Sequence, residues 1–188
     1  MPRATTTLST STRLTGDDLE QAWKVYEVAF SSLTTRAVQQ HLMTRAEFEE
    51  VCSDERVLKY VARDVDRDDA VCAFATFSND LSTVYQLSED YYRARWPRQF
   101  AEGSIWYIGC VGVHPSYRSS GVFVKLVEAM CRVVHEQGGV ASLDICRYND
   151  ERLALPRLIE RVVHSFGHAA EGERLDEQTY WAYDFSRV

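Results

Sequence analysis

Features that define several protein classes are missing from this chain of 188 residues. No apolar run reaches about 18 residues, so no membrane-spanning helix is expected. Basic residues are outnumbered, with 21 Lys and Arg against 28 Asp and Glu and a net charge of −7. The absence of a positive excess disfavours broad binding to nucleic acids or anionic membranes. The five histidines show no HExxH or CxxC…H spacing, and no metal site is expected.

Paired cysteines are also missing. The five cysteines are an odd number, form no CxxC and stand beside apolar residues, which predicts reduced, buried thiols and a reducing compartment. The first 16 residues lack the apolar core of a secretory signal. We therefore expect a cytoplasmic protein.

The composition is that of an ordinary globular domain, with 45% hydrophobic and 26% charged residues. The length predicts one domain over residues 1–188, with residues 1–6 frayed and an aromatic-rich insertion at residues 78–104. The pattern predicts a mixed α/β order with one sheet. Its expected elements are a first strand after the frayed end, helices over 17–30 and 44–52, strands over 57–63, 70–77 and 105–113, a helix from 121 to about 137, a strand over 140–147, a helix from 156 to about 165 and a last strand over 178–185.

The insertion at residues 78–104 carries five aromatic residues among many charges, and Pro97 interrupts any long helix there. Large aromatic side chains supply stiff apolar contact area. Two interpretations stay open: the segment packs its aromatics on the core, or it forms a lid or wall over a substrate pocket. An aromatic surface of this kind is also typical of a homodimer contact.

The most informative segment is residues 111–123, VGVHPSYRSSGVF. It predicts a buried strand, a tight turn of small residues and a helix that begins near Gly121. Free backbone N–H groups at such a turn, the helix dipole and the charge of Arg118 together suit an anion such as a diphosphate.

This segment resembles the acyl-CoA-binding signature of the GNAT superfamily of N-acyltransferases. That signature is a Val-x-Val strand, then x-Pro-x-aromatic, then Arg or Gln-x-x-Gly at the start of a long helix. The matching positions are Val111, Val113, Pro115, Tyr117, Arg118 and Gly121. Downstream, residues 143–149 resemble the next strand of the family.

The resemblance implies a single mixed, mostly antiparallel central sheet flanked by helices. It implies transfer of an acetyl or other acyl group from acyl-CoA to the amine of a small molecule, by direct attack through a tetrahedral intermediate. The co-substrate is acetyl-CoA or another acyl-CoA. The strands would splay so that the pantetheine arm pairs with the backbone of Val111 and Val113, and a backbone N–H near Val111 would stabilise the oxyanion. The donor contacts that it implies are Cys110, Val111, Gly112, Val113, Arg118, Ser119, Ser120, Gly121, Val122, Phe123 and Asn149.

Three positions depart from the family pattern. Phe123 stands where a small residue is usual, and its ring either faces the core or alters the donor site. Ser120 replaces a residue that often contacts phosphate. The tyrosine that many relatives use as the thiolate acid corresponds here to Val163.

Substitute catalytic residues can be named from their places in the pattern. The candidates are Tyr107 on the central strand, Tyr148 near the splay and His164 beside the vacant tyrosine position. Packing or surface roles are the alternatives for all three. Asp144 either faces the acceptor amine or pairs with Arg147.

Two other functions remain open. An acyl-carrier-protein-dependent N-acyltransferase would need a basic docking patch, for which Arg93, Arg95 and Arg98 are candidates. A catalytically silent protein that binds acyl-CoA as a sensor would explain the missing tyrosine.

Overall fold

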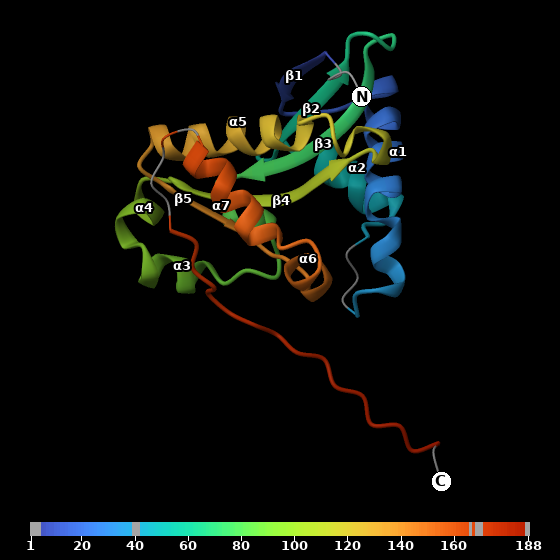
Figure 1. Ribbon diagram of the computed structural model, residues 1–188. Helices are drawn as coiled ribbons and strands as arrows, with labels where there is room; N and C mark the ends of the chain where they lie inside the picture. Colours follow the sequence, from blue (N-terminus) through green and yellow to red (C-terminus); the bar gives the residue numbers. More distant parts are fainter. Residues whose placement is uncertain (1–4, 39–41, 166, 168–170, 187–188) are drawn as a thin grey trace.

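The computed structural model describes residues 5–38, 42–165, 167 and 171–186. Its centre is one five-stranded sheet in the order β1-β2-β3-β4-β5 (Figure 1). The first four strands pair antiparallel, and β4 and β5 pair parallel. The strands are β1 Thr6–Ser11, β2 Leu58–Asp64, β3 Ala70–Ser78, β4 Ile105–Val113 and β5 Val140–Leu143. The predicted single mixed, mostly antiparallel sheet is therefore confirmed.

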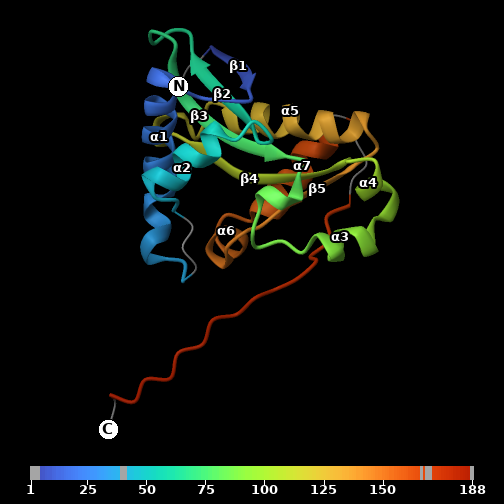
Figure 2. The same ribbon diagram turned by 180° about the vertical axis from the view of Figure 1, so that it is seen from behind.

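Helices cover both faces of this sheet. The α5 and α7 helices lie on one face, and α1 and α2 lie on the other (Figures 1 and 2). The α3 and α4 helices lie on the α1 side, beside the start of β4. The α-helices are α1 Gly16–Phe30, α2 Arg45–Ser53, α3 Glu89–Arg95, α4 Pro97–Ala101, α5 Val122–Glu136, α6 Arg147–Glu151 and α7 Leu155–Ser165.

Local sequence signals explain where several of these helices begin. The Thr44 side chain accepts a hydrogen bond from the Glu47 backbone, and the Glu47 carboxylate accepts one from the Thr44 backbone. This reciprocal cap satisfies two N–H groups that a helix start leaves free. The expected helix over residues 44–52 is confirmed as α2.

The α5 helix does not bury Phe123 in the core, which was one of the two alternatives for its ring. The deeply buried residues of α5 begin at Val122, and Val122, Leu126, Met130 and Val134 follow one another at intervals of four. Phe123 lies about 100° away around the helix from Val122, because the helix has about 3.6 residues per turn. It is half-buried and belongs to none of the three core clusters.

The aromatic-rich segment 78–104 packs on the core. Leu81 and Tyr92 form a buried cluster with Ile105 and Tyr107 of β4, and Trp96 and Phe100 pack against it. Tyr85 and Tyr91 are the exceptions and are 95% and 43% exposed. Of the two interpretations of this segment, the structure shows the packing one, on the α1 side of the sheet.

Three expectations about the ends or the presence of elements are wrong. Thr6 pairs with Asp64 and opens β1, so residue 6 is not frayed, and residues 1–4 of that expectation lie outside the described residues. The strand expected over residues 140–147 ends at Leu143, and residues 147–151 form α6 instead. The last strand, expected over 178–185, is not formed: this segment is extended and exposed and leaves the body of the molecule (Figure 1).

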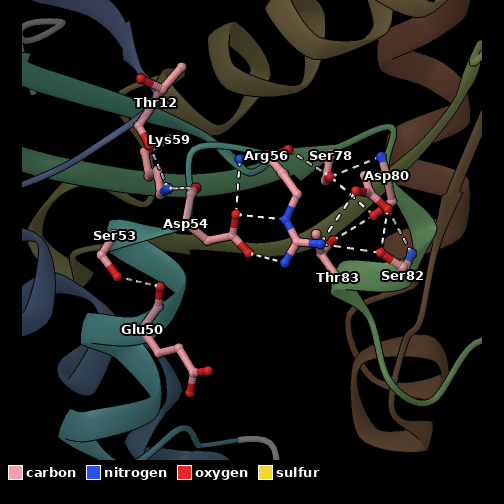
Figure 3. A network of polar contacts seen from close by, with 10 residues as sticks. All are labelled: Thr12, Glu50, Ser53, Asp54, Arg56, Lys59, Ser78, Asp80, Ser82 and Thr83. Carbon is pink, nitrogen blue, oxygen red and sulfur yellow. Dashed lines mark hydrogen bonds and ion pairs between the residues drawn. The ribbon is translucent and has the colours of Figure 1, made fainter.

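A polar network beside the C-terminal end of α2 joins the end of β1, the start of β2 and the end of β3 (Figure 3). The Lys59 ammonium is completely buried and donates to the backbone carbonyls of Thr12 at 2.9 Å and Asp54 at 2.6 Å. Arg56 pairs with Asp54 at 2.6 Å and with Asp80 at 3.5 Å. Burial lowers the pKa of Lys59. The network fixes the loop that follows α2 to the one that follows β3.

All five cysteines are free thiols. Cys52 and Cys72 are buried as expected, whereas Cys110, Cys131 and Cys146 are only half-buried. Within the described ranges no group of three or more His, Cys, Asp or Glu residues is arranged to hold a metal ion. No helix in the same ranges has the length and apolar character needed to cross a bilayer.

Candidate active site

The sheet opens between β4 and β5. Their parallel pairing runs from Ile105 and Val140 to Ile108 and Leu143, and it ends there. The next residues, Gly109 on β4 and Asp144 after β5, begin the open part. From Gly109 onward, β4 is therefore paired with β3 but no longer with β5.

A bulge in β4 lies at the same point. The register with β3 shifts between Thr76 and Phe77, which face Cys110 and Ile108, so Gly109 is the extra residue. A Cβ at Gly109 would stand 2.7 Å from the Thr76 hydroxyl oxygen, which is too close for a side chain. A bulge changes which face the following side chains point to. Glycine inside an apolar strand was the sequence signal for it.

The bulge places Cys110 on the same face as Tyr107. Trp106 and Ile108 pack on the α5 face, and after the bulge Val111 and Val113 do so as well. Cys110 instead packs with the α1 and α2 cluster. Without the extra residue, strict alternation would put Cys110 on the α5 face.

The backbone of Val111 and Val113 faces the opening. The backbone N–H of His114 donates to the Cys72 carbonyl at 2.9 Å, so these two residues form a hydrogen-bonded pair. Two residues earlier, Gly112 lies opposite Phe74 in the same register. Residues of an antiparallel pair alternate between bonding to the partner and pointing away from it. The N–H and C=O groups of Val111 and Val113 therefore point to the side where β5 has ended.

The turn after β4 is tied to distant strands. The Tyr117 hydroxyl donates to the Asp64 carboxylate of β2 at 2.7 Å, and Asp64 is buried. Lys125 on α5 donates to the hydroxyl of Thr6 at 2.8 Å and to its carbonyl at 3.1 Å. These contacts hold the turn and the start of α5 in place relative to the sheet.

The start of α5 presents free backbone donors. Gly121 has a φ of +86° with open space around its Cβ position, a conformation that favours glycine. The Val122 N–H is capped by the Ser120 hydroxyl at 3.3 Å, so Ser120 has a local structural role. Within the described part of the chain, no acceptor is found for the N–H groups of Ser119, Gly121, Phe123 and Val124.

Arg118 adds a positive charge beside these donors. It is exposed and forms no ion pair with a described residue. Backbone N–H groups and a helix N-terminus favour an anion by about 0.3–1 kcal/mol per charge near the surface. Together with Arg118 they make this turn suited to a phosphate or diphosphate.

Tyr107 and Asp144 are in contact at the opening. The buried Tyr107 hydroxyl donates a hydrogen bond to the exposed Asp144 carboxylate. Burial and the nearby Asp144 charge raise the pKa of Tyr107 far above its ordinary value. Tyr107 is therefore neutral at physiological pH and cannot act as a base. Arg147, the alternative partner of Asp144, pairs with Glu151 at 2.7 Å instead.

The other predicted residues lie on the two helices that follow β5. Tyr148 lies on α6, where its hydroxyl accepts a hydrogen bond from Arg36 at 2.6 Å and its ring lies 4.7 Å from the Arg36 guanidinium. Asn149 is on α6 rather than on a strand. His164 is exposed on α7, and Val163 beside it is buried. Sequence analysis missed Arg36, for which no motif gave a signal.

His114 ends β4 as a capping residue. Its imidazole accepts a hydrogen bond from the Ser116 N–H at 3.3 Å.

Burial raises the pKa of the Cys110 thiol to about 11, with a smaller contribution from the Asp144 charge. Cys110 is therefore a protonated thiol at neutral pH.

Several solved structures with the same fold are acetyltransferases. An aminoglycoside acetyltransferase from an uncultured soil metagenomic sample, in complex with trehalose, has a TM-score of 0.55 at 13% identity over 95% of this chain and 97% of that one. A Trypanosoma brucei acetyltransferase has a TM-score of 0.52 at 15% identity over 93% and 100%. A predicted acetyltransferase of Clostridium acetobutylicum with acetyl-CoA has a TM-score of 0.50 at 10% identity over 93% and 96%. No curated protein sequence matches the chain.

The fold is thus that of an acetyltransferase. The chain belongs to the Acetyltransferase (GNAT) family, whose sequence profile matches residues 19–158. The matched range contains the opening of the sheet, the turn with Arg118 and Asp144.

Proposed function

We propose that the protein is an N-acyltransferase that moves an acetyl or other acyl group from acyl-CoA to the amine of a small molecule. The observation that carries this proposal is the free backbone of Val111 and Val113, which leads directly into the turn of free N–H groups at the start of α5. One continuous surface thus offers strand-like pairing and then an anion site. Acyl-CoA has the same order of groups, an amide-containing arm followed by a diphosphate.

In this proposal the pantetheine amides pair with Val111 and Val113, and the diphosphate lies on the free N–H groups at the start of α5, those of Ser119, Gly121, Phe123 and Val124. The thioester then lies near Gly109 and Cys110, where the two strands part. A backbone N–H of β4 facing the opening would stabilise the oxyanion of the tetrahedral intermediate. The donor group is held by the backbone, and specificity for the acceptor depends on the side chains around the opening.

The three arginines considered for a carrier-protein surface are all engaged. Arg93 pairs with Asp90 and stacks on Phe100, Arg95 pairs with Glu173 at 2.9 Å, and Arg98 pairs with Glu102 at 3.2 Å. Their charges are offset locally, so no observation favours an acyl carrier protein over CoA as the donor.

Calorimetric binding of acetyl-CoA tests the proposal, with S-acetyl-pantetheine, which lacks the diphosphate, as the second ligand. We expect micromolar binding of acetyl-CoA and at least tenfold weaker binding of S-acetyl-pantetheine. Arg118→Glu is expected to weaken acetyl-CoA binding at least tenfold. Arg132→Glu makes the same charge change farther along α5, where Arg132 pairs with Glu128 at 2.7 Å, and serves as the matched control. Equal binding of both ligands would place the donor elsewhere.

A further inference from the structure

We propose that Asp144 is the acceptor-binding residue and the general base of the reaction, and that Tyr107 is a positioning residue that holds its carboxylate. This inference rests on the proposed N-acyltransferase function. It gives the acceptor a chemical class, a compound with an exposed, protonated primary amine.

The pairing of β4 with β5 brings these two residues together. Tyr107 faces Ser142 in the register, and Asp144 is two residues farther along on the same face. Diagonal neighbours of this kind lie within reach of a long aromatic side chain. The bulge at Gly109 places Cys110 on that face too. The carboxylate therefore lies beside the part of β4 where the proposal puts the thioester.

The two residues differ sharply in exposure. Tyr107 is 3% exposed, whereas Asp144 is exposed and forms no ion pair with any described residue. A carboxylate that is accessible, unneutralised and held by one neutral hydrogen bond retains the capacity to bind a cation. The negative net charge of the chain, −7, adds a weak attraction for a cationic acceptor.

The surroundings of Tyr107 fix its hydroxyl. Behind it, the Tyr92 hydroxyl and the Ser142 hydroxyl are 2.6 Å apart in a buried hydrogen bond. Gln86 is a further hydrogen-bond partner of the Tyr107 side chain. The titratable groups beside this pair include Tyr92 from α3 and Cys110 from β4, and burial raises the pKa of the Cys110 thiol to about 11, so this thiol is neutral at physiological pH. These contacts hold the Tyr107 hydroxyl in place, so that it orients the Asp144 carboxylate while it stays protonated.

The proposed step balances as follows. The Asp144 carboxylate takes one proton from the ammonium group, and the neutral amine attacks the thioester carbonyl carbon. A C–N bond forms, the tetrahedral intermediate collapses, and the C–S bond breaks. The nitrogen loses a second proton, which the thiolate takes up to give the CoA thiol. The proton on Asp144 is released to solvent, which regenerates the carboxylate.

The test uses the full chain with acetyl-CoA and a panel of primary amines: tyramine, spermidine and an aminoglycoside. For Asp144→Asn we expect kcat/KM to fall about 10²–10⁴-fold, the range typical of general acid–base catalysis, while the Kd for acetyl-CoA changes less than threefold. Glu151→Gln, an exposed carboxylate on the adjacent α6, is the matched control and should keep its rate. Asp144→Glu should recover part of the lost rate.

Tyr107→Phe tests the positioning role through the separate values of kcat and KM. Without its donor the Asp144 carboxylate is no longer held beside the thioester, so kcat should fall about tenfold while the Kd for acetyl-CoA changes less than threefold. Tyr60→Phe removes a buried tyrosine hydroxyl on the α5 side of the sheet and should leave kcat unchanged. Thermal melting identifies any variant that fails to fold.

The outcomes separate this inference from the proposed function. Wild-type turnover that survives unchanged in Asp144→Asn would overturn the inference alone. A wild-type protein that binds no acetyl-CoA, or that binds it and acetylates none of the amines, would overturn both.

Discussion

The Tyr117 hydroxyl donates a 2.7 Å hydrogen bond to the buried carboxylate of Asp64, across 53 residues of sequence. Tyr117 belongs to the turn that precedes α5, and Asp64 ends β2. The aromatic position of the family signature therefore has a structural reason in this chain: it anchors the anion-binding turn to the sheet.

Tyr117→Phe removes this anchor and leaves Asp64 with fewer donors. We expect the variant to lose about 1–3 kcal/mol of stability, the usual cost of a buried polar group that loses its partner. It should also bind acetyl-CoA several-fold more weakly, because the turn is no longer held to β2. Denaturant unfolding and calorimetry measure the two effects, and full stability together with full affinity would contradict the anchoring role.

Gly121 tests the backbone geometry of the turn. Its φ of +86° is unfavourable for most residues, although a Cβ there would meet nothing within 4 Å. Gly121→Val should therefore be destabilised by at least about 1 kcal/mol and bind acetyl-CoA more weakly, whereas Gly121→Asn should be milder because Asn tolerates positive φ. The Val and Asn side chains would begin in the same open space at position 121, so the comparison isolates the backbone conformation. Equal losses in the two would show that bulk, not backbone conformation, is responsible.

Lys59→Met tests the network of Figure 3. The variant leaves the carbonyls of Thr12 and Asp54 without their buried donor. We expect a loss of about 1–2 kcal/mol at neutral pH, from one or two unmade hydrogen bonds. Lys24→Met removes the same charge from an exposed position on α1 and should stay within about 0.5 kcal/mol of the wild type, as is usual for a surface change.

The same variant has a pH dependence with a defined sign. Burial lowers the pKa of Lys59 in the folded state, so the native protein loses this proton before the unfolded chain does. Wild-type stability should therefore rise relative to Lys59→Met as pH increases toward the unfolded value of about 10.4. Urea unfolding at several pH values measures the difference. A difference that shrinks as pH rises would contradict this account of the buried ammonium.

Cys110 should be a poor nucleophile despite its place in the candidate site. With a pKa of about 11, only about one thiol in a thousand is ionised at pH 8. Iodoacetamide labelling followed by mass spectrometry should be slow at pH 7 and accelerate roughly tenfold per pH unit. Rapid labelling at pH 7 would contradict the raised pKa of Cys110, and an acetyl group found on Cys110 after incubation with acetyl-CoA would contradict direct transfer.

Elements specified by nearby residues were predictable from the sequence. The strand over residues 105–113 and the helix capped by Thr44 agree with the structure, because apolar continuity and a capping box are local signals. The last strand was not predictable in the same way. Alternating aromatics over 178–185 indicate a fit to a pleated surface, yet a strand needs a neighbour, and the segment has none in the described ranges.

Single residues of the candidate site were predictable from the sequence, but their arrangement was not. Tyr107 and Asp144 were each named from the sequence, but their contact depends on the register of β4 with β5. The face of Cys110 depends on the bulge at Gly109, which comes from the pairing with β3. Such long-range pairings are not encoded by spacing along the chain.

The most direct test of the account is the calorimetric Kd of acetyl-CoA for the wild-type chain and for Arg118→Glu. We predict micromolar binding to the wild type and at least tenfold weaker binding to the variant. Binding that is absent from the wild type, or unchanged in the variant, would contradict a donor site on the open half of β4 and the start of α5.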